Sequence, residues 1–483
     1  MRNLTMMTDL YELTMMYGYF KYNMHHNKAV FDVFYRKQGD VTARAVAAGL
    51  EQAVEYVKNI RFTEDDLEYL RSLNLFDEPF LKELSTFRFT GDIDAVPEGT
   101  IVFPGEPIVR VIGPIMEAQF LETTLLNIIN HQTLIATKAA RVCQSAGGGS
   151  VLEFGLRRAQ GPDAGIYGAR ASIIGGCAST SNVLTGQLFD VPVGGTHAHS
   201  WVMSFPSELE AFRAYARIFP NSCMLLVDTY DTLKSGVPNA IKVFNELRAD
   251  GFEPVGIRLD SGDLAYLSRT ARKMLDDAGF PKAKICASGD LDEEVIWDLK
   301  AQGACIDIWG VGTKMITSAD NPALGGVYKM SAEIVDGVVY PRIKISENPV
   351  KITNPGIKTL YRIYDNYTGM ALADLIALES EQYDENQPLT IFDPENTWKS
   401  MTLTNYSMRR LLVPIFRNGV CVYECPKLMD IAAYEKEEDG TFWEEYKRLH
   451  LPHRYKVDLS KPLYDLKQEL LNTYHKNQEK EGK

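Results

Sequence analysis

Four apolar segments between residues 225 and 313 repeat one pattern, and this pattern limits the folds open to the chain. The first segment, Leu225–Val227, is followed by the polar stretch Asp228–Asp231 and then by a helical pattern that Gly251 closes. The other three segments are Val255–Leu259, Lys284–Ala287 and Ile306–Trp309. One repeat takes about 22–32 residues, which is the size of a strand–helix unit. Strands that alternate with helices in this way predict a parallel β-sheet covered by helices.

Polar residues and glycines stand at the carboxyl end of each predicted strand. Several successive strand–helix units with such ends favour an irregular, TIM-like βα barrel, with an open doubly wound sheet as the alternative. In a barrel all of these strand ends face one pocket. The residues concerned are Glu153, Arg157, His199, Asp228, Arg258, Asp260, Asp263, Ser288, Gly289, Asp290, Gly310, Gly312 and Thr313.

The chemistry of this set indicates a ligand that combines a sugar with phosphate. Glycine-rich strand ends that lead into helices present backbone N–H groups to an anion. Carboxylates bind Mg²⁺ or the diol of a ribose, and arginines hold phosphate or carboxylate groups bidentately. For any one of these residues a helix cap or a solvated turn is the simpler interpretation. Their occurrence on successive strands favours a phosphorylated sugar with a metal ion. The sequence contains neither G-x-x-x-x-G-K-[ST] nor H-E-x-x-H, so a P-loop ATPase or a zinc protease is not supported.

The loop Gly194–Trp201 is a second candidate for chemistry, because it carries two of the eight histidines of the chain, His197 and His199. Histidine titrates near neutrality and has a nucleophilic ring nitrogen. The glycines before the two histidines let the backbone turn tightly and approach a ligand. A polar loop in which the histidines only form hydrogen bonds is the alternative for an isolated histidine.

Both ends of the chain depart from the strand–helix repeat. Met7–Met16 predicts a helix with Thr8 as its N-cap, and the strand Phe31–Tyr35 ends at the basic pair Arg36 and Lys37. Short runs between residues 85 and 115 predict a small antiparallel sheet, and a long helix is expected from about Glu117 to Ala146. The repeat stops after about residue 345. We therefore expect a barrel over residues 119–345 and a discontinuous α+β domain built from residues 1–118 and 346–483, the latter with a helical tail.

Composition narrows the classes of partner. The 483 residues include 51 Lys and Arg against 64 Asp and Glu, a net charge of -13, which disfavours nucleic acids and anionic membranes. Seven scattered cysteines are typical of a reduced, cytosolic protein, and Cys421 and Cys425 lack the second pair that a metal site needs. No signal peptide and no apolar stretch long enough to span a bilayer is apparent. We expect a cytoplasmic protein.

Seven short segments, taken in their order, identify a resemblance. The chain resembles the nicotinate phosphoribosyltransferase family over most of its length. The segments that carry the resemblance are Thr8–Tyr11, Tyr35–Lys37, Glu153–Pro162, Gly195–Ser200, Arg258–Asp263, Ala287–Asp290 and Gly310–Thr313. The fold that this resemblance implies is an irregular α/β barrel flanked by a discontinuous domain from both chain ends.

The resemblance implies a reaction that joins nicotinate to 5-phosphoribosyl 1-pyrophosphate (PRPP) and yields nicotinate mononucleotide and pyrophosphate. It also implies coupling to ATP hydrolysis through a phosphohistidine, with Mg²⁺ as the cofactor that accompanies ATP and PRPP. His199 is the histidine that matches the family, and His197 stands where the family varies. Basic residues of the first domain commonly reach a neighbouring subunit in this family, so a homodimer with sites at the interface is implied.

The resemblance also implies roles for individual residues. Tyr11 and Phe154 would stack on the pyridine ring, and Arg258 with Thr196 would face its carboxylate. Asp260 would contact the ribose side. From strand order alone, Glu153 is expected to orient the His199 ring by accepting its second N–H. The remaining candidates, for ribose, phosphate or pyrophosphate, are Arg36, Lys37, Arg157, Ser288, Gly289, Asp290, Gly310, Gly312, Thr313, Lys344 and Ser346.

Ser181 bears on the choice between the acid and the amide substrate. Related nicotinamide enzymes place an Asp near this position, which accepts the amide N–H and would repel a carboxylate, so Ser181 favours nicotinate. Three alternatives remain beside the transferase. They are a nicotinamide phosphoribosyltransferase, an aldolase with a Schiff-base lysine at Lys314 or Lys234, and a non-catalytic nucleotide sensor, which has no need for a phosphorylatable His199.

Overall fold

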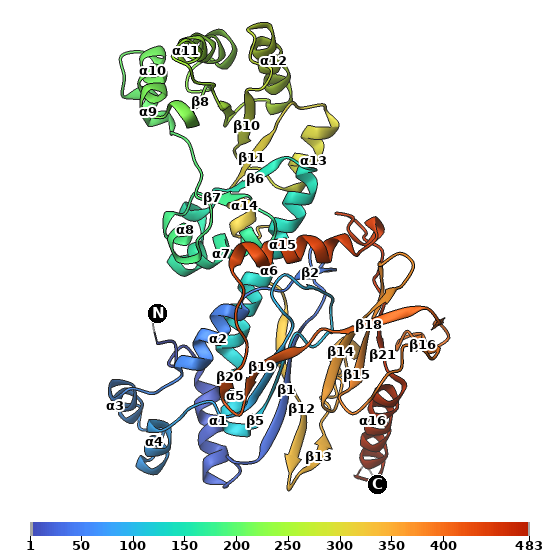
Figure 1. The fold of residues 1–483 in the computed structure, drawn as a ribbon. Coiled ribbons are helices and arrows are strands. Elements are labelled where there is room, and N and C mark those ends of the chain that lie inside the picture. The colour runs from blue at the N-terminus through green and yellow to red at the C-terminus, as the bar shows by residue number, and fades with distance from the viewer. Residues whose placement is uncertain (1–2, 482–483) are drawn as a thin grey trace. The chain divides into compact units, whose positions relative to one another are not determined.

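Two units divide the chain in the computed structural model, which describes residues 3–481 (Figure 1). Unit 1 comprises the chain up to Leu134, Ala323–Pro426 and the chain from Ala433 onward. Unit 2 comprises Ile135–Pro322 and Lys427–Ala432. Two helices, α6 (Glu122–Ala146) and α15 (Leu428–Gly440), run from one unit into the other. The boundaries expected from sequence, at residues 118/119 and 345/346, stay predictions.

A six-stranded parallel sheet forms the centre of unit 2. Its strand order is β7 (Ser179–Thr180), β6 (Ser150–Glu153), β11 (Ile308–Val311), β10 (Lys284–Ser288), β9 (Gly256–Leu259) and β8 (Met224–Leu226). All five neighbouring pairs are parallel, as the alternation of strands and helices predicted. Hydrogen bonds do not join β7 to β8 in the described part of the chain, so closure into a barrel stays a prediction.

Helices separate the strands of this sheet along the sequence. They are η1 (Leu156–Arg158), α7 (Pro162–Ile174), α8 (Val183–Phe189), α9 (His199–Met203), α10 (Glu208–Ile218), η2 (Pro220–Ser222), the π-helix η3 (Thr232–Gly236), α11 (Val237–Ala249), α12 (Leu264–Asp277), α13 (Glu293–Ala301) and α14 (Thr313–Ile316). Ile257, Leu259 and Ile285 are fully buried, because a parallel sheet with helices on its faces shields both sides of each strand.

Several polar residues at the strand ends serve as helix caps. Asp231 accepts a hydrogen bond from the backbone N–H of Lys234, and Asp263 accepts one from the N–H of Tyr266. Such contacts satisfy backbone N–H groups that have no partner within the helix. The simpler interpretation, a capped helix, therefore explains Asp263, although the pattern had grouped it with the candidate site residues.

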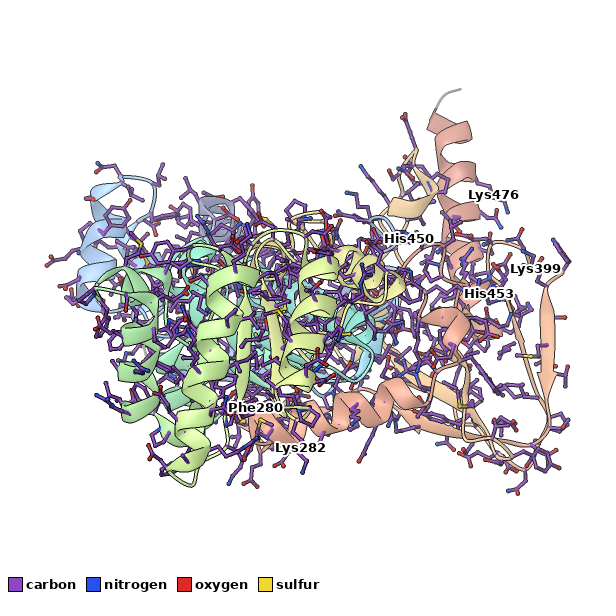
Figure 2. The ribbon with its side chains drawn as sticks, turned by 90° about the horizontal axis from the view of Figure 1, so that it is seen from above. Phe280, Lys282, Lys399, His450, His453 and Lys476 are labelled. Atoms are coloured by element: carbon purple, nitrogen blue, oxygen red, sulfur yellow. The ribbon has the colours of Figure 1, made fainter. Side chains whose placement is uncertain are left out.

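The helices α11 and α12 are joined to each other by one aromatic side chain. The guanidinium carbon of Arg248, in α11, lies 4.0 Å from the ring centroid of Phe280, and Phe244 meets the same ring edge-on at 5.6 Å. Phe280 is labelled at the end of α12 in Figure 2. A cation over an aromatic face is attractive, so this contact fixes the turn that leads into β10.

Unit 1 is built on a seven-stranded sheet with the order β13 (Val338–Pro341), β12 (Gly326–Val335), β1 (Lys28–Tyr35), β5 (Val109–Pro114), β3 (Asp92–Ala95), β19 (Val413–Arg417) and β20 (Val420–Cys421). Its neighbouring strands are antiparallel. One sheet thus joins strands from the first quarter of the chain to strands from its last third.

The other elements of unit 1 complete its layers. A four-stranded sheet has the order β18 (Tyr406–Arg410), β14 (Lys358–Asp365), β15 (Ala371–Leu378) and β21 (Val457–Leu459), and two short pairs are β2 (Ala45–Val46) with β4 (Ile101–Val102) and β16 (Leu389–Phe392) with β17 (Ser400–Leu403). The helical elements are α1 (Leu10–Lys21), α2 (Leu50–Asn59), α3 (Glu64–Ser72), α4 (Glu78–Ser85), α5 (Ile115–Phe120), η4 (Pro349–Lys351), η5 (Glu444–Tyr446) and α16 (Lys461–Glu481).

Two helix predictions differ from the structure in detail. The first helix begins at Leu10, and its N-cap is Asp9 rather than Thr8. The long helix expected from Glu117 is interrupted at Leu121, which separates α5 from α6. Among the described residues, no helix combines the length and the apolar character that crossing a membrane requires.

Candidate active site

Arg258, in β9, connects several candidate residues of unit 2. Its Nε donates to Ser288 Oγ at 2.9 Å, its Nη1 to Thr196 Oγ1 at 3.0 Å and its Nη2 to Asp260 Oδ1 at 2.8 Å. Ser288 Oγ also donates to Asp260 Oδ1. β9 and β10 are parallel neighbours, so the ends of both strands lie at the same edge of the sheet. The structure therefore brings Arg258, Asp260 and Ser288 together with Thr196, and their role as a substrate site stays a prediction.

Asp260 is held as a carboxylate. Burial alone would raise its pKa, but the hydrogen bond from Ser288 and the positive charge of Arg258 outweigh burial and lower the pKa below its usual value. Its backbone N–H donates to Asp228 Oδ2 at 2.9 Å, and Ser261 Oγ donates to the same oxygen at 2.6 Å. The Asp228 carboxylate therefore fixes the turn that carries Asp260.

His199 is the first residue of α9, and its side chain is 39% exposed. The ring Nδ1 lies 3.1 Å from Thr229 Oγ1, and the ring Nε2 lies 3.7 Å from Asp260 Oδ2. Both neighbours come from strand ends, Thr229 after β8 and Asp260 after β9. The imidazole thus stands beside the cluster around Arg258, open to solvent on one side.

His197 has a different environment from His199. Its side chain is buried, and its Nε2 accepts a hydrogen bond from the backbone N–H of Leu226 at 3.2 Å. Burial is the main cause that lowers its pKa to about 4, so the ring is neutral at pH 7. The lone pair of Nε2 is occupied and the ring packs 4.7 Å from Tyr215. These contacts describe a structural histidine.

Glu153 does not contact the His199 ring, which corrects the expected hydrogen bond between them. The buried carboxylate instead accepts hydrogen bonds from Thr180 Oγ1 at 2.6 Å and from the backbone N–H of Gly155. Burial raises the pKa of Glu153 above its usual value. The expectation failed because strand order in space differs from order along the chain. Two strands, β11 and β10, separate β6, which carries Glu153, from β9.

Phe154 follows β6 and presents its ring beside the Arg258 guanidinium, whose carbon lies 5.6 Å from the ring centroid. A Cβ added at Gly310 would lie 2.7 Å from the Phe154 ring, so only a glycine leaves room for this aromatic side chain. The backbone N–H of Ser181 donates to the carbonyl of Glu153 at 2.9 Å, which places Ser181 beside the end of β6. An apolar ring, a guanidinium and a small hydroxyl residue therefore stand along one edge of the sheet.

The other phosphate and ribose candidates of unit 2 lie on the turns that follow β6, β10 and β11. Ser288 is buried, and Gly289 adopts a φ of 96°, which a larger side chain resists. Asp290 follows with a φ of 43°. The remaining candidates are Gly312 and Thr313 at the start of α14 and Arg157, which is exposed on η1.

The candidates Tyr11, Arg36, Lys37, Lys344 and Ser346 belong to unit 1. Tyr11 is 44% exposed, and burial is the main cause that raises its pKa to about 12, so the hydroxyl stays protonated. Lys344 donates its backbone N–H to Thr353 Oγ1 at 2.9 Å, and Ser346 Oγ accepts from the N–H of Asn348 at 3.3 Å.

A cavity of about 520 Å³ in unit 1 is lined by both members of the basic pair, Arg36 and Lys37. The Nε of Arg36 is buried and has no hydrogen-bond partner among the described residues. Four further basic side chains line the same cavity, Lys329, Lys358, Arg454 and Lys467, together with the carboxylates of Asp32 and Glu395. The four basic residues stand far apart in the sequence, and no local motif connects them to the end of β1.

No three His, Cys, Asp or Glu side chains gather into a metal-binding group in the described part of the chain. Carboxylate oxygens that suit Mg²⁺ are nevertheless available at the strand ends. Asp228 Oδ1 is buried and has no hydrogen-bond partner among the described residues. Asp260 Oδ2 lies 3.7 Å from His199 Nε2. These two carboxylates fit an ion that arrives bound to phosphate groups.

Comparisons with known proteins show the family to which the chain is similar. Models of the nicotinate phosphoribosyltransferase (NAPRTase) N-terminal and C-terminal domains match residues 6–130 and 357–467. The nicotinate phosphoribosyltransferase of Bacillus subtilis is 48% identical over 470 residues, covering 97% of this chain and 96% of its own. The nicotinate phosphoribosyltransferase of Homo sapiens is 34% identical and covers 95% of both chains.

Solved structures give the same result. The crystal structure of human nicotinic acid phosphoribosyltransferase matches with a TM-score of 0.83 at 31% identity, covering 96% of this chain and 99% of that chain. The nicotinate-nucleotide pyrophosphorylase from Pyrococcus furiosus shares the fold, with a TM-score of 0.70 at 22% identity over 91% of this chain and 96% of that chain.

A parallel α/β sheet with charged and glycine-rich strand ends is typical of enzymes that bind small molecules at that edge of the sheet. The chain belongs to the nicotinate phosphoribosyltransferase family, whose members serve NAD salvage.

Proposed function

We propose that this protein joins nicotinate to PRPP, releases nicotinate mononucleotide and pyrophosphate, and couples this reaction to ATP hydrolysis through a phosphohistidine at His199. The observation that best supports the proposal is the position of the His199 ring beside Asp260, which is itself bonded to Arg258. A nucleophilic imidazole, a carboxylate and a guanidinium suited to an acidic substrate then share one edge of the sheet.

Arg258 would bind the carboxylate of nicotinate. A guanidinium has five N–H donors, and three of those of Arg258 are used by Ser288, Thr196 and Asp260. One N–H on each terminal nitrogen therefore remains for a carboxylate. The neighbouring Phe154 ring offers a stacking surface for the pyridine, and Tyr11 would supply the second surface.

His199 would accept the γ-phosphoryl group of ATP on a ring nitrogen, with ADP as the leaving group, and water would later cleave the N–P bond. The exposed ring of His199 suits this role better than the buried ring of His197, whose Nε2 already accepts the N–H of Leu226. Phosphorylation would tighten the binding of PRPP and drive the equilibrium toward product.

The strand ends from Ser288 to Asp290 and from Gly310 to Thr313 would bind the ribose and its 5′-phosphate through backbone N–H groups. Mg²⁺ would neutralise the phosphate charge of ATP and PRPP, and Asp228 and Asp260 are the carboxylates available to hold it. The basic cavity of unit 1 would bind the phosphate or pyrophosphate group of a substrate held in the neighbouring subunit's site. Arg36 has a buried N–H there without a partner among the described residues, which suits this role.

The aldolase alternative is disfavoured by the state of its candidate lysines. Lys314 Nζ donates to Asp292 Oδ2 at 2.5 Å, and this hydrogen bond raises the pKa of Lys314, whereas a Schiff base requires a neutral amine. Lys234 is 88% exposed, so it lacks the enclosed apolar pocket in which a Schiff-base lysine is activated. A sensor would bind nicotinate mononucleotide but would not turn over PRPP.

A product assay with nicotinate and nicotinamide in parallel, with and without ATP, tests the proposed reaction. We expect kcat/KM for nicotinate to exceed that for nicotinamide by about a thousandfold or more. Nicotinamide has no carboxylate, so the charge of Arg258 would stay unpaired when the amide binds. Ser181→Asp should weaken the use of nicotinate by charge repulsion. Equal turnover of the two substrates would show that the specificity assignment is wrong.

Light scattering tests the proposed homodimer. We expect a mass of twice 54.3 kDa and a loss of activity on dilution, because the basic cavity of unit 1 would complete the site of the neighbouring subunit. A monomer that keeps full activity at every dilution would refute the shared site. If the site is not shared, Arg36→Ala should leave PRPP binding unchanged. If the dimer shares its sites, the same variant should bind PRPP more weakly.

A further inference from the structure

Thr229 is the side chain that hydrogen-bonds the His199 ring in the described part of the chain. Its Oγ1 lies 3.1 Å from Nδ1, within hydrogen-bond distance, whereas the contact of Nε2 with Asp260 measures 3.7 Å. Thr229 directly follows Asp228 after β8, so a strand of the central sheet sets the position of its hydroxyl. A single threonine after a strand carries no motif, so the sequence gives no signal for this residue.

The His199 ring depends on such a contact for its orientation. The side chain is 39% exposed, and it starts α9, a helix of only five residues. Ring rotation about χ2 is a broad torsion, so packing on one side does not fix the plane of an imidazole. A hydrogen bond to one ring nitrogen selects the tautomer and the plane, and it thereby determines where the other nitrogen points.

The nitrogen that accepts a phosphoryl group must keep its lone pair, and this sets the direction of the hydrogen bond. A proton on Nδ1 donates to Thr229 Oγ1 at 3.1 Å. Nε2 then keeps its lone pair, because its 3.7 Å separation from Asp260 Oδ2 is longer than a hydrogen bond. Thr229 thus accepts the ring N–H for which the sequence had suggested Glu153 as acceptor.

We propose that Thr229 is a positioning residue for His199, and that its hydroxyl holds the imidazole in the orientation that accepts a phosphoryl group. This inference rests on the proposed phosphohistidine. Thr229 does not bind substrate and does not react; it acts through the ring. Loss of its hydroxyl should slow the step at His199 without changing the binding of nicotinate around Arg258.

The test compares Thr229→Val, which keeps the shape and removes the hydroxyl, with Thr229→Ser, which keeps the hydroxyl. We expect Thr229→Val to lower the rate of acid-labile labelling by γ-labelled ATP roughly 10–100-fold, as loss of an orienting partner typically does. Thr229→Ser should restore labelling, and KM for nicotinate without ATP should be unchanged in both. Ser204→Ala is the matched control, because its hydroxyl lies on the same short helix region but donates to the carbonyl of Trp201.

Two outcomes would overturn the inference while leaving the phosphohistidine intact. They are labelling of Thr229→Val at the rate of the unaltered protein, and an equal loss in both Thr229 variants with a lowered melting temperature. If the unaltered protein takes no label, the phosphohistidine itself fails. The imidazole ¹⁵N spectrum then decides about Thr229, with His199→Ala used to assign the resonances. A change of the Nδ1 resonance in Thr229→Val supports the hydrogen bond, and an unchanged resonance refutes it.

Discussion

His199→Ala is expected to abolish acid-labile labelling of the protein by γ-labelled ATP and to lower the coupled ATP hydrolysis by at least about a thousandfold. A phosphoramidate is a high-energy bond that forms only when ATP, Mg²⁺ and a nucleophilic nitrogen meet, and alanine removes that nitrogen. A slow, ATP-independent synthesis of nicotinate mononucleotide should remain at high substrate concentration, because Arg258 and the strand ends that hold the substrates are untouched.

His197→Ala is the comparison that tests the choice of histidine. This variant should keep its label, because its ring accepts the N–H of Leu226 and packs against Tyr215. It should be less stable by about 2–4 kcal/mol, since a buried ring is lost and a buried N–H is left unpaired. Label that survives in His199→Ala and vanishes in His197→Ala would assign the phosphohistidine to His197. Label that survives both changes would exclude this loop.

The parallel sheet of unit 2 was predictable because its sequence signal is strong. Buried parallel strands read as short apolar runs, and glycines such as Gly251 and Gly279 close the helices between them with positive φ. The boundaries of β9 and β10 agree with the pattern to within a residue. Closure into a barrel is a different kind of property, since it depends on pairing between distant strands, and no local pattern encodes it.

Some contacts of the candidate site could also be predicted from the sequence, and others could not. Arg258, Asp260 and Ser288 were predicted together because each stands at the end of a strand, and parallel strands end at one edge. The supposed contact between Glu153 and His199 was wrong because the order of strands in the sheet follows crossover connections, which the sequence does not show. Glu153 is instead bound by Thr180.

Residues outside any local sequence motif could not be predicted as members of a site. Thr229 is one of many threonines, and only the three-dimensional contact of its hydroxyl with His199 distinguishes it. Lys329, Arg454 and Lys467 line one cavity with Arg36 although they come from separate parts of the chain. A sequence pattern records neighbours along the chain, whereas such clusters arise from the pairing of β1 with β12 and from the C-terminal segments beside them.

Arg258→Gln is expected to lower kcat/KM for nicotinate by about 100- to 1000-fold, and mainly through KM. Glutamine cannot offer the two parallel N–H donors that a carboxylate accepts from a guanidinium, and it also leaves the carboxylate of Asp260 without its positive partner. Arg258→Lys keeps the charge but loses the planar fork, so its activity should lie between those of the other two proteins.

The matched control for this change is Arg213→Gln, which removes an exposed guanidinium that is hydrogen-bonded to Glu246 and not to a residue of the site. Exposed ion pairs contribute about 1 kcal/mol or less, so this variant should keep its activity and nearly all of its stability. The amide substrate gives the decisive comparison. If Arg258 binds the carboxylate, Arg258→Gln loses activity toward nicotinate but not its residual activity toward nicotinamide, and the preference between the two narrows. An unchanged KM for nicotinate would remove Arg258 from the substrate site and leave it as the structural partner of Asp260, Ser288 and Thr196 alone.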